Sequence, residues 1–406
     1  MGGDASVPNT SSSLGSCAAA RQQRELTARP PYAHNSERMN RKTRTTALIV
    51  LMLIRTALPL WAGGAAEPDT PPSQTATPGT PSLVRDAVGR EVSFDGRPQR
   101  IVAAGPATLM IADLLYAFPV ARQHLVALGR IEQGRGDFLA AIDPRIAQLP
   151  RLERRPSVEA IAAQRPDLVV MKSSARTAIG QQIEELGLRV FYVNLETPED
   201  YRRDVTALGA VLYAEERARQ IVAYIDRIVA RASELAPPGS TQDTLFLAAR
   251  QSDDGLALQV PPAGWIQTSL VTLAGGRPLW TEDAVGQGWT TVTIEQIAAW
   301  NPDIILLTSY DAGVVALRDS LAARSPWNRL DAVVSDRFFA VPLDFYSWDQ
   351  PDLRWLLGLQ WAAVALRDGD LTRLEPAVRE FYATMFDLDD RAFERHIAPL
   401  LVGDGF

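Results

Sequence analysis

Ser157-Val-Glu-Ala-Ile-Ala-Ala-Gln-Arg-Pro-Asp-Leu-Val-Val-Met171 occurs a second time, 136 positions later, as Thr293-Ile-Glu-Gln-Ile-Ala-Ala-Trp-Asn-Pro-Asp-Ile-Ile-Leu-Leu307. The two stretches align without a gap and are identical at six of their fifteen positions. This duplicated motif decides the fold, because each copy is typical of one structural unit: a helix, a Pro-Asp turn and a strand.

The first half of each copy predicts a short helix. A serine or threonine stands where an N-cap is expected, and a glutamate (Glu159 or Glu295) follows in the first turn, where the helix dipole favours negative charge. The proline of the Pro-Asp pair then blocks continuation of the helix. The apolar run after it is typical of a strand that is covered on both faces, as in parallel sheets.

The same alternation of strands and helices extends through both halves of the chain and indicates βαβ units. We therefore expect an α/β fold with two Rossmann-like lobes that have mostly parallel sheets. The predicted strands are 100–104, 125–128, 167–172 and 188–193 in the first lobe, and 244–249, 257–260, 303–308 and 338–341 in the second.

One long helix is predicted between the lobes, over residues 214–235. This run has no Gly or Pro and repeats apolar residues at three- and four-residue spacing. A rigid strut of this kind favours a small hinge motion. The expected divisions are an N-terminal α/β lobe at 83–213, an inter-lobe helix at 214–236, and a C-terminal α/β lobe with closing helices at 237–406.

The start of the chain differs from the rest. Residues 1–38 are polar and without pattern, and we expect them to be disordered or untranslated. Residues 39–66 combine basic residues, an apolar run and a small-residue end, the layout of a secretory signal peptide. A Pro/Thr/Ser linker follows at 67–82. We expect an exported protein, periplasmic or on the outer face of the cytoplasmic membrane; cleavage of the signal or its retention as an anchor stays open.

Charge and composition narrow the classes of function. The 406 residues carry a net charge of −7, but residues 1–66 sum to +5 and the remainder to −12. An acidic body argues against nucleic acid as the main partner. The single cysteine, Cys17, excludes an intrachain disulfide and Cys-based metal sites, and three histidines are too few for a multi-His site.

Several short stretches, taken in order, resemble the substrate-binding proteins of ABC importers for iron–siderophores, haem and cobalamin. They are Asp86-Ala-Val-Gly-Arg-Glu-Val92, Arg100-Ile-Val-Ala-Ala104, both copies of the duplicated motif, Thr197-Pro-Glu-Asp200, the long helix, and Trp348-Asp-Gln-Pro with Trp355-Leu-Leu-Gly-Leu. The resemblance runs from about residue 83 to the C-terminus. It implies two lobes joined by one rigid helix, a ligand in the cleft between them, and a monomer.

The resemblance also implies partners. In that family the glutamate at this point of each motif pairs with arginines of the membrane permease, so Glu159 and Glu295 are the expected docking residues. The partners are then an ABC importer permease dimer with its ATPase and a small-molecule chelate. No cofactor and no directly bound metal are expected.

Ligands of open α/β sheets bind beyond the carboxyl ends of the strands, so the loops at those ends supply the expected cleft residues. Basic side chains there could pair with carboxylate or hydroxamate oxygens, and aromatic ones could stack on an organic shell. The expected ligand-binding residues are Thr108, Arg130, Arg135, Lys172, Arg176, Trp265, Trp289, Tyr310, Tyr346 and Trp348.

A ferric siderophore is the expected ligand, because the loops are basic and aromatic. Haem stays open, since Tyr310 or Tyr346 could serve as an axial ligand; cobalamin and an oxyanion stay open as well. A sensor lobe or a two-lobed enzyme is the alternative of another class. We do not expect an enzyme, because the common catalytic motifs G-x-S-x-G, H-E-x-x-H, Walker A and G-x-G-x-x-G do not occur.

Overall fold

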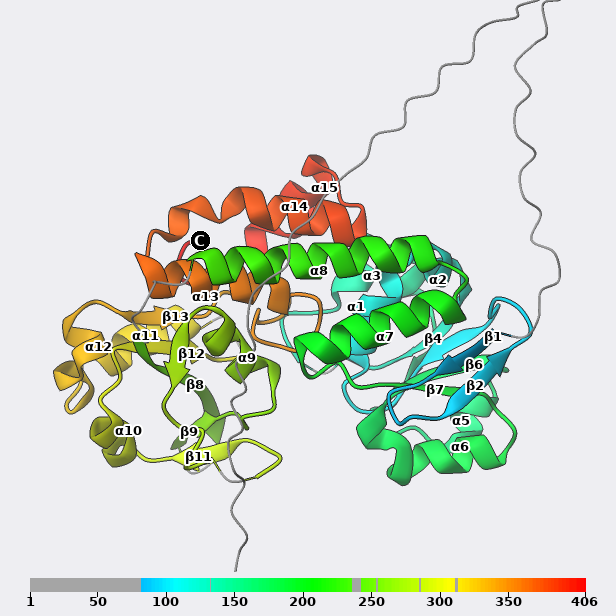
Figure 1. Cartoon of the computed structure of the whole chain (residues 1–406), viewed down its shortest axis with the longest axis horizontal. Helices are drawn as coiled ribbons and strands as arrows, with labels where there is room; N and C mark the ends of the chain where they lie inside the picture. Colours follow the sequence, from blue (N-terminus) through cyan, green and yellow to red (C-terminus); the bar gives the residue numbers. More distant parts are fainter. Residues whose placement is uncertain (1–81, 132, 236–241, 253–254, 285, 311–312) are drawn as a thin grey trace, which may run out of the picture. The chain divides into compact units, whose positions relative to one another are not determined.

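The computed structural model describes residues 82–131, 133–235, 242–252, 255–284, 286–310 and 313–406 (Figure 1). The segment expected to be disordered or untranslated, the signal peptide and almost all of the linker lie outside these residues. Among the helices of the described part, none is at once long and apolar enough to cross a membrane.

A five-stranded sheet organises the N-terminal lobe. Its strand order is β5-β4-β3-β6-β7 and all neighbours are parallel, as expected. Helices α5 and α6 lie on one side of this sheet, and α1 and α7 on the other (Figure 1). An antiparallel hairpin precedes it. The strands are β1 Ser82–Arg85, β2 Glu91–Phe94, β3 Ile101–Ala103, β4 Leu125–Gly129, β5 Arg151–Leu152, β6 Leu168–Lys172 and β7 Val190–Val193.

A second, separate sheet organises the C-terminal lobe. Its order is β11-β9-β8-β12-β13, with β10 also paired to β8. Here the sheet is mixed: β8, β10, β12 and β13 run parallel, whereas β9 pairs with β8 and β11 in antiparallel fashion. The strands are β8 Gln242–Ser252, β9 Gly255–Val260, β10 Gly276–Pro278, β11 Thr290–Val292, β12 Ile304–Thr308 and β13 Phe338–Ala340.

One helix connects the two lobes. It was expected over 214–235 and spans Glu215–Leu235 as α8 without a break. Its apolar stripe, which includes Ile221, Ile225 and Ile228, is buried, and the helix packs against α7 of the first lobe and α13 of the second. The 21 residues extend over about 32 Å at 1.5 Å per residue, long enough to contact both lobes.

The remaining helices surround the sheets or close the C-terminal lobe. They are α1 Thr108–Tyr116, α2 Pro119–His124, α3 Phe138–Ile142, α4 Pro144–Ala147, α5 Val158–Ala162, α6 Gln181–Glu185, α7 Pro198–Val211, α9 Ile266–Leu273, α10 Ile294–Trp300, α11 Val314–Ala322, α12 Asp331–Val334, α13 Trp355–Arg367, α14 Glu375–Phe386 and α15 Asp390–His396.

The duplicated motif forms α5–β6 in one lobe and α10–β12 in the other, in two different sheets. The Ser157 hydroxyl accepts a hydrogen bond from the amide of Ala160 at 3.2 Å, and Thr293 forms a reciprocal capping box with Gln296. Both helices are therefore held at their N-termini as the sequence indicated.

The Pro-Asp pair has a second function that the structure reveals. The Asp167 carboxylate accepts the backbone N–H groups of Gln99 and Arg100 at 2.7 and 2.9 Å, just before β3 begins. The Asp303 carboxylate accepts the N–H of Asp243 at 2.9 Å, at the start of β8. In each lobe this aspartate thus aligns the beginning of the neighbouring parallel strand.

Both faces of β6 are buried, as its continuous apolar run predicted. Leu168 and Val170 belong to the large core that includes α1 and α7, whereas Val169 and Met171 belong to a smaller core against α5 and α6. This assignment follows the two-residue period of a strand. The sheet therefore holds its carboxyl-terminal loops on a rigid base.

Candidate functional site

Two adjoining cavities lie at the carboxyl-terminal edge of the strands, between residues of both lobes. They share Met110, Gln133 and Arg250 among their lining residues, and their volumes are about 350 and 300 Å³. The first is lined by Gly105, Ala107, Thr108, Leu109, Met110, Arg130, Ile131, Gln133, Arg154 and Arg250. The second is lined by Met110, Gln133, Glu196, Arg250, Trp265, Gln267, Trp289, Tyr310, Gln350 and Pro351.

Three arginines make the first cavity basic. Arg130, Arg154 and Arg250 line it, and its lining includes no acidic residue. Arg130 pairs with the exposed Glu153 at 3.2 Å, and the pair is mostly solvated. Partnerships of this kind are weak, so the guanidinium can turn toward an anion at little cost.

Aromatic rings and one guanidinium form the wall of the second cavity. The rings of Trp265 and Trp289 meet edge to face with centroids 5.6 Å apart, and Trp289 meets Tyr310 in the same way at 6.5 Å. The Arg250 guanidinium lies 5.5 Å from the Trp289 ring centroid and 5.1 Å from that of Tyr310. This stacking orients a positive charge without neutralising it.

The elements explain why these side chains converge. Tyr310 follows the carboxyl end of β12, Trp265 caps α9, Trp289 directly precedes β11, and Arg250 lies near the end of the long strand β8. Met110 comes from the first turn of α1, which follows β3. The site therefore forms where an open α/β sheet usually binds its ligand.

A buried carboxylate fixes the floor of the second cavity. Asp349 accepts hydrogen bonds from Thr308 Oγ1 at 2.9 Å, Tyr310 Oη at 3.1 Å and Gln267 Nε2 at 3.2 Å. Burial raises the pKa of Asp349 and places the pKa of Tyr310 well above its ordinary value of 10.0. The Tyr310 hydroxyl is thus held protonated and engaged with Asp349.

The structure brings five of the ten expected ligand-binding residues to these cavities: Thr108, Arg130, Trp265, Trp289 and Tyr310. The buried Thr108 hydroxyl donates to the Gly105 carbonyl at 2.6 Å, so it shapes the loop before α1. Ligand contact by these five stays a prediction.

The other three expected cationic residues lie elsewhere. Arg135 donates from Nη1 to the Leu400 carbonyl at 2.6 Å, which ties its loop to the C-terminal segment. Lys172 is buried and pairs with Glu196 at 2.6 Å, and Arg176 lies 3.9 Å from Glu184 beside α6. None of the three lines either cavity, because each is engaged in its own lobe or in the contact between the lobes; ligand contact by them stays a prediction.

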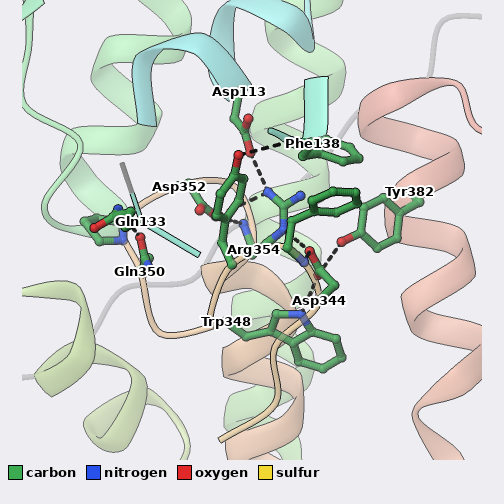
Figure 2. Close-up of polar contacts among 12 residues, drawn as sticks. Asp113, Gln133, Phe138, Asp344, Trp348, Gln350, Asp352, Arg354 and Tyr382 are labelled. Carbon is green, nitrogen blue, oxygen red and sulfur yellow. Dashed lines mark hydrogen bonds and ion pairs between the residues drawn. The ribbon is translucent and has the colours of Figure 1, made fainter. Parts of the chain in front are cut away.

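The last two expected aromatic residues are buried in the protein interior. Tyr346 accepts the backbone N–H of Phe138 at 3.1 Å, and Trp348 donates from Nε1 to Asp344 at 2.9 Å. The Tyr346 ring centroid lies 4.9 Å from Arg354 Cζ, and Trp348 is connected to Arg354 through Asp344 (Figure 2). The aromatic residues of this segment predicted an exposed cleft loop. In the structure they pack in the interior, beside the buried guanidinium of Arg354 and its partner Asp344.

Sequence reasoning missed most of the polar residues of the cavities. Arg250 was overlooked because it lies within a strand, beyond the segment expected to end at residue 249. Gln133 donates from Nε2 to Gln350 Oε1 at 2.6 Å and connects the lobes across the cavity floor (Figure 2). Arg250, Gln133 and Gln350 come together at the cavities only in the folded protein, so no local sequence pattern marks them. The other missed polar residues are Arg154, Glu196 and Gln267, and the missed apolar ones include Met110 and Pro351.

The two expected docking residues are exposed and lie in the first turns of α5 and α10. Hydrogen bonds from their own backbone N–H groups, and then from the Ser157 and Thr293 hydroxyls, lower the pKa values of Glu159 and Glu295. Both side chains are therefore anionic and available to a partner. Within the described residues no group of His, Cys, Asp and Glu is arranged to hold a metal ion.

Comparison with known proteins agrees with this architecture. Residues 150–344 match the model of a family described as periplasmic binding protein. An uncharacterized ABC transporter substrate-binding lipoprotein, YvrC of Bacillus subtilis, is 21% identical over 324 residues, covering 74% of this chain and 91% of the relative. The molybdate-binding protein MolA of Haemophilus influenzae is 23% identical, covering 76% and 93%.

A solved structure shares the fold. The periplasmic solute-binding protein of Veillonella parvula superposes with a TM-score of 0.60 at 20% sequence identity, covering 78% of this chain and 97% of that one. At this level of identity the similarity establishes the two-lobed architecture.

Proposed function

Because residues 150–344 match the periplasmic binding protein family, we propose that the chain captures an anionic metal chelate, a ferric siderophore, in the inter-lobe cavities and delivers it to an ABC importer. The expected site of action is outside the cytoplasmic membrane. The match to this family supports the general function, which is capture of a solute for transport. The ligand class is argued from the cavities.

The single observation that carries the ligand class is Arg250, a cation that lines both cavities and rests on two aromatic rings. Glu196, the acidic residue in the lining of the second cavity, is offset by its ion pair with Lys172. The cavities therefore combine uncompensated positive charge with flat apolar surface. This combination suits an anionic ligand with an organic shell.

Size favours an organic ligand over a bare ion. Pockets for organic molecules have volumes of roughly 300–1,000 Å³, and each cavity alone reaches the lower end of that range. Haem is disfavoured as ligand, because Tyr310, the tyrosine that lines the second cavity, is bound to Asp349 and its pKa is raised. Axial ligation would require its phenolate.

An oxyanion is the second candidate. The relative MolA is named as a molybdate-binding protein, and Arg130, Arg154 and Arg250 could pair with a tetrahedral oxyanion in the basic first cavity. The aromatic wall of the second cavity would then have no ligand surface to contact, which is why the chelate is the leading proposal.

The ligand class is tested by titrating the purified protein with ferric hydroxamate, ferric catecholate, haem, cobalamin and molybdate, and following tryptophan fluorescence. We expect saturable quenching by a ferric chelate, because Trp265 and Trp289 line the cavity, and recovery of the bound compound unchanged after release. Saturation by molybdate alone supports the oxyanion candidate, and slow consumption of the bound compound would instead identify an enzyme.

We also propose that Glu159 and Glu295 dock the protein onto basic residues of the permease. Reversal of both charges, Glu159→Arg with Glu295→Arg, should abolish uptake in cells and leave ligand affinity unchanged, since both side chains are exposed and outside the cavity linings. Reversal of the exposed Glu234 and Glu282 serves as control and should leave uptake intact. Unimpaired uptake in the first double variant contradicts the docking role.

A further inference from the structure

A fully buried charge cluster joins the N-terminal lobe to the segment before α13. Arg354 has no exposed surface, and its Nη1 lies 2.5 Å from Asp113 Oδ2 of α1 (Figure 2). Its Nε donates to Asp344 Oδ1 at 2.8 Å, and Asp352 Oδ1 lies 3.9 Å from Nη1. The Asp113–Arg354 pair is therefore a buried ion pair between the lobes.

Aromatic rings enclose the guanidinium on its remaining sides. The Arg354 Cζ atom lies 4.4 Å from the ring centroid of Phe138, 4.9 Å from that of Tyr346 and 5.8 Å from that of Tyr382. Rings attract a cation but provide no formal counter-charge, and they keep the surroundings at low polarity. The charge balance is therefore set by the three carboxylates.

Three ionised carboxylates beside one guanidinium would leave two negative charges in the protein interior, which is strongly unfavourable. Asp344 is satisfied as an anion, because it accepts from Arg354 Nε, the Phe345 amide, Trp348 Nε1 and Tyr382 Oη. By contrast, Asp113 Oδ1 and Asp352 Oδ2 are buried oxygens that have no hydrogen-bond partner among the described residues.

We propose that Asp113 and Asp352 form a proton-binding site at the contact between the lobes, and that its proton occupancy sets how firmly the N-terminal lobe is held against residues 342–354. The excess of negative charge is relieved by protons on the two carboxyl groups whose oxygens lack partners. When those protons leave, the uncompensated charge loosens the contact.

The electrostatic surroundings agree with this assignment. Burial, partly opposed by Arg354, raises the pKa of Asp113 from 3.8 to about 6, and burial places the pKa of Asp352 well above its usual value. Asp113 therefore exchanges its proton in the mildly acidic range. This makes Asp113 the responsive member of the site.

The direction of the pH effect follows from linkage. The folded protein binds the Asp113 proton more tightly than the unfolded chain, so this site contributes stability that is complete below pH 3.8 and is lost as the pH rises to about 6. Opening the contact to water acts in the same direction, because hydration returns the pKa toward its ordinary value. Acid therefore tightens the contact.

The other ionisable groups that face the site come from several elements. They are Asp137 at the start of α3, Tyr201 of α7, Tyr382 of α14, and Asp344 and Tyr346 of the same segment as Arg354. Burial raises the pKa values of all three tyrosines, so these side chains stay neutral throughout the acidic range. Asp137 is paired with Arg151 at 2.6 Å.

The proton site lies directly behind the ligand cavities. Met110, which lines both cavities, precedes Asp113 by about one turn of α1, and Pro351, which lines the second, immediately precedes Asp352. Tyr201 also fixes this region by donating to the Pro351 carbonyl at 2.9 Å. A shift in the contact between the lobes would therefore move cavity-lining residues through α1 and through the loop that contains Pro351.

The test compares the unfolding of the full chain, without ligand, from pH 4 to 8 in wild type, Asp113→Asn and Asp352→Asn. The wild-type unfolding equilibrium constant should rise on the order of a hundredfold between pH 4 and 7 relative to Asp113→Asn, because the variant cannot lose this proton. Asp352→Asn should also flatten the dependence, because the folded protein retains a proton that Asp352 releases when the chain unfolds. Asp95→Asn, an exposed control, should keep all of it.

Infrared spectroscopy of the wild type provides a second readout that does not depend on a variant folding. A protonated-carboxyl band should be present at pH 7 and grow as the pH falls through 6. If Asp113→Asn folds and follows the wild-type pH dependence, or if no such band is present at pH 7, the proposal is wrong. Neither readout involves the ligand, so the outcome is independent of the proposed function.

Discussion

Replacement of Arg354 with methionine should lower the free energy of unfolding at pH 7 by about 3–5 kcal/mol, the usual cost of leaving buried charge without its partner. Methionine approximates the length of the side chain but leaves Asp113 and Asp344 without their counter-ion in a site that water does not reach. Guanidinium chloride denaturation at fixed pH measures the change.

Arg379 is a matched control for this prediction. It also contacts three carboxylates, those of Glu375, Asp390 and Glu394, and stacks on a ring, but its partners are exposed. Because solvated ion pairs contribute about 0–1 kcal/mol, Arg379→Met should have a small effect. Equal losses in the two variants would show that the buried cluster has no special role in stability.

Replacement of Arg250 with methionine should weaken binding of the ligand by about 2–5 kcal/mol, roughly 30-fold to several-thousand-fold. Arg250 lines both cavities and, in the described part of the chain, its guanidinium lies against Trp289 and Tyr310 and is not paired with an acidic residue. Its charge is therefore available to an anion.

The loss at Arg250 should appear in the dissociation constant and not in the stability of the free protein. The side chain is exposed, and exposed substitutions usually change stability by less than about 0.5 kcal/mol. Arg324→Met, at an exposed arginine outside both cavity linings, should bind the ligand like the wild type. Unchanged affinity in Arg250→Met would remove the main argument for an anionic ligand.

The fold was predictable from the sequence where local chemistry determines it. The capped helix, Pro-Asp turn and apolar strand of each repeat encode their own structure, and the uninterrupted apolar stripe of α8 does the same. The antiparallel pairing of β9 and β11 was not predictable in this way, because strand direction depends on which neighbour a strand meets.

The cavities were predictable only in part. Loops after parallel strands indicated Thr108, Arg130 and Tyr310, since the carboxyl ends of strands mark the binding edge. Arg250 lies inside β8, and Gln133 and Gln350 meet from opposite lobes, so no local pattern distinguishes them.

In segment 344–354 the aromatic composition predicted a ligand-binding loop, but the structure buries Tyr346 and Trp348. Its aromatic residues resemble those of a ligand-binding loop, but Arg354 lies ten residues beyond Asp344 and draws Tyr346 and Trp348 into the interior. Asp113, 241 positions before Arg354, completes the ion-pair cluster from the N-terminal lobe.

Titration of the wild-type protein with a siderophore, first loaded with ferric ion and then metal-free, is the most direct test of anionic-chelate capture between the lobes. We predict saturation at one equivalent with a dissociation constant in the micromolar range or tighter for the ferric form, and much weaker binding of the metal-free form. An absence of saturation by ferric hydroxamates and catecholates alike, at concentrations where molybdate saturates the protein, would contradict it.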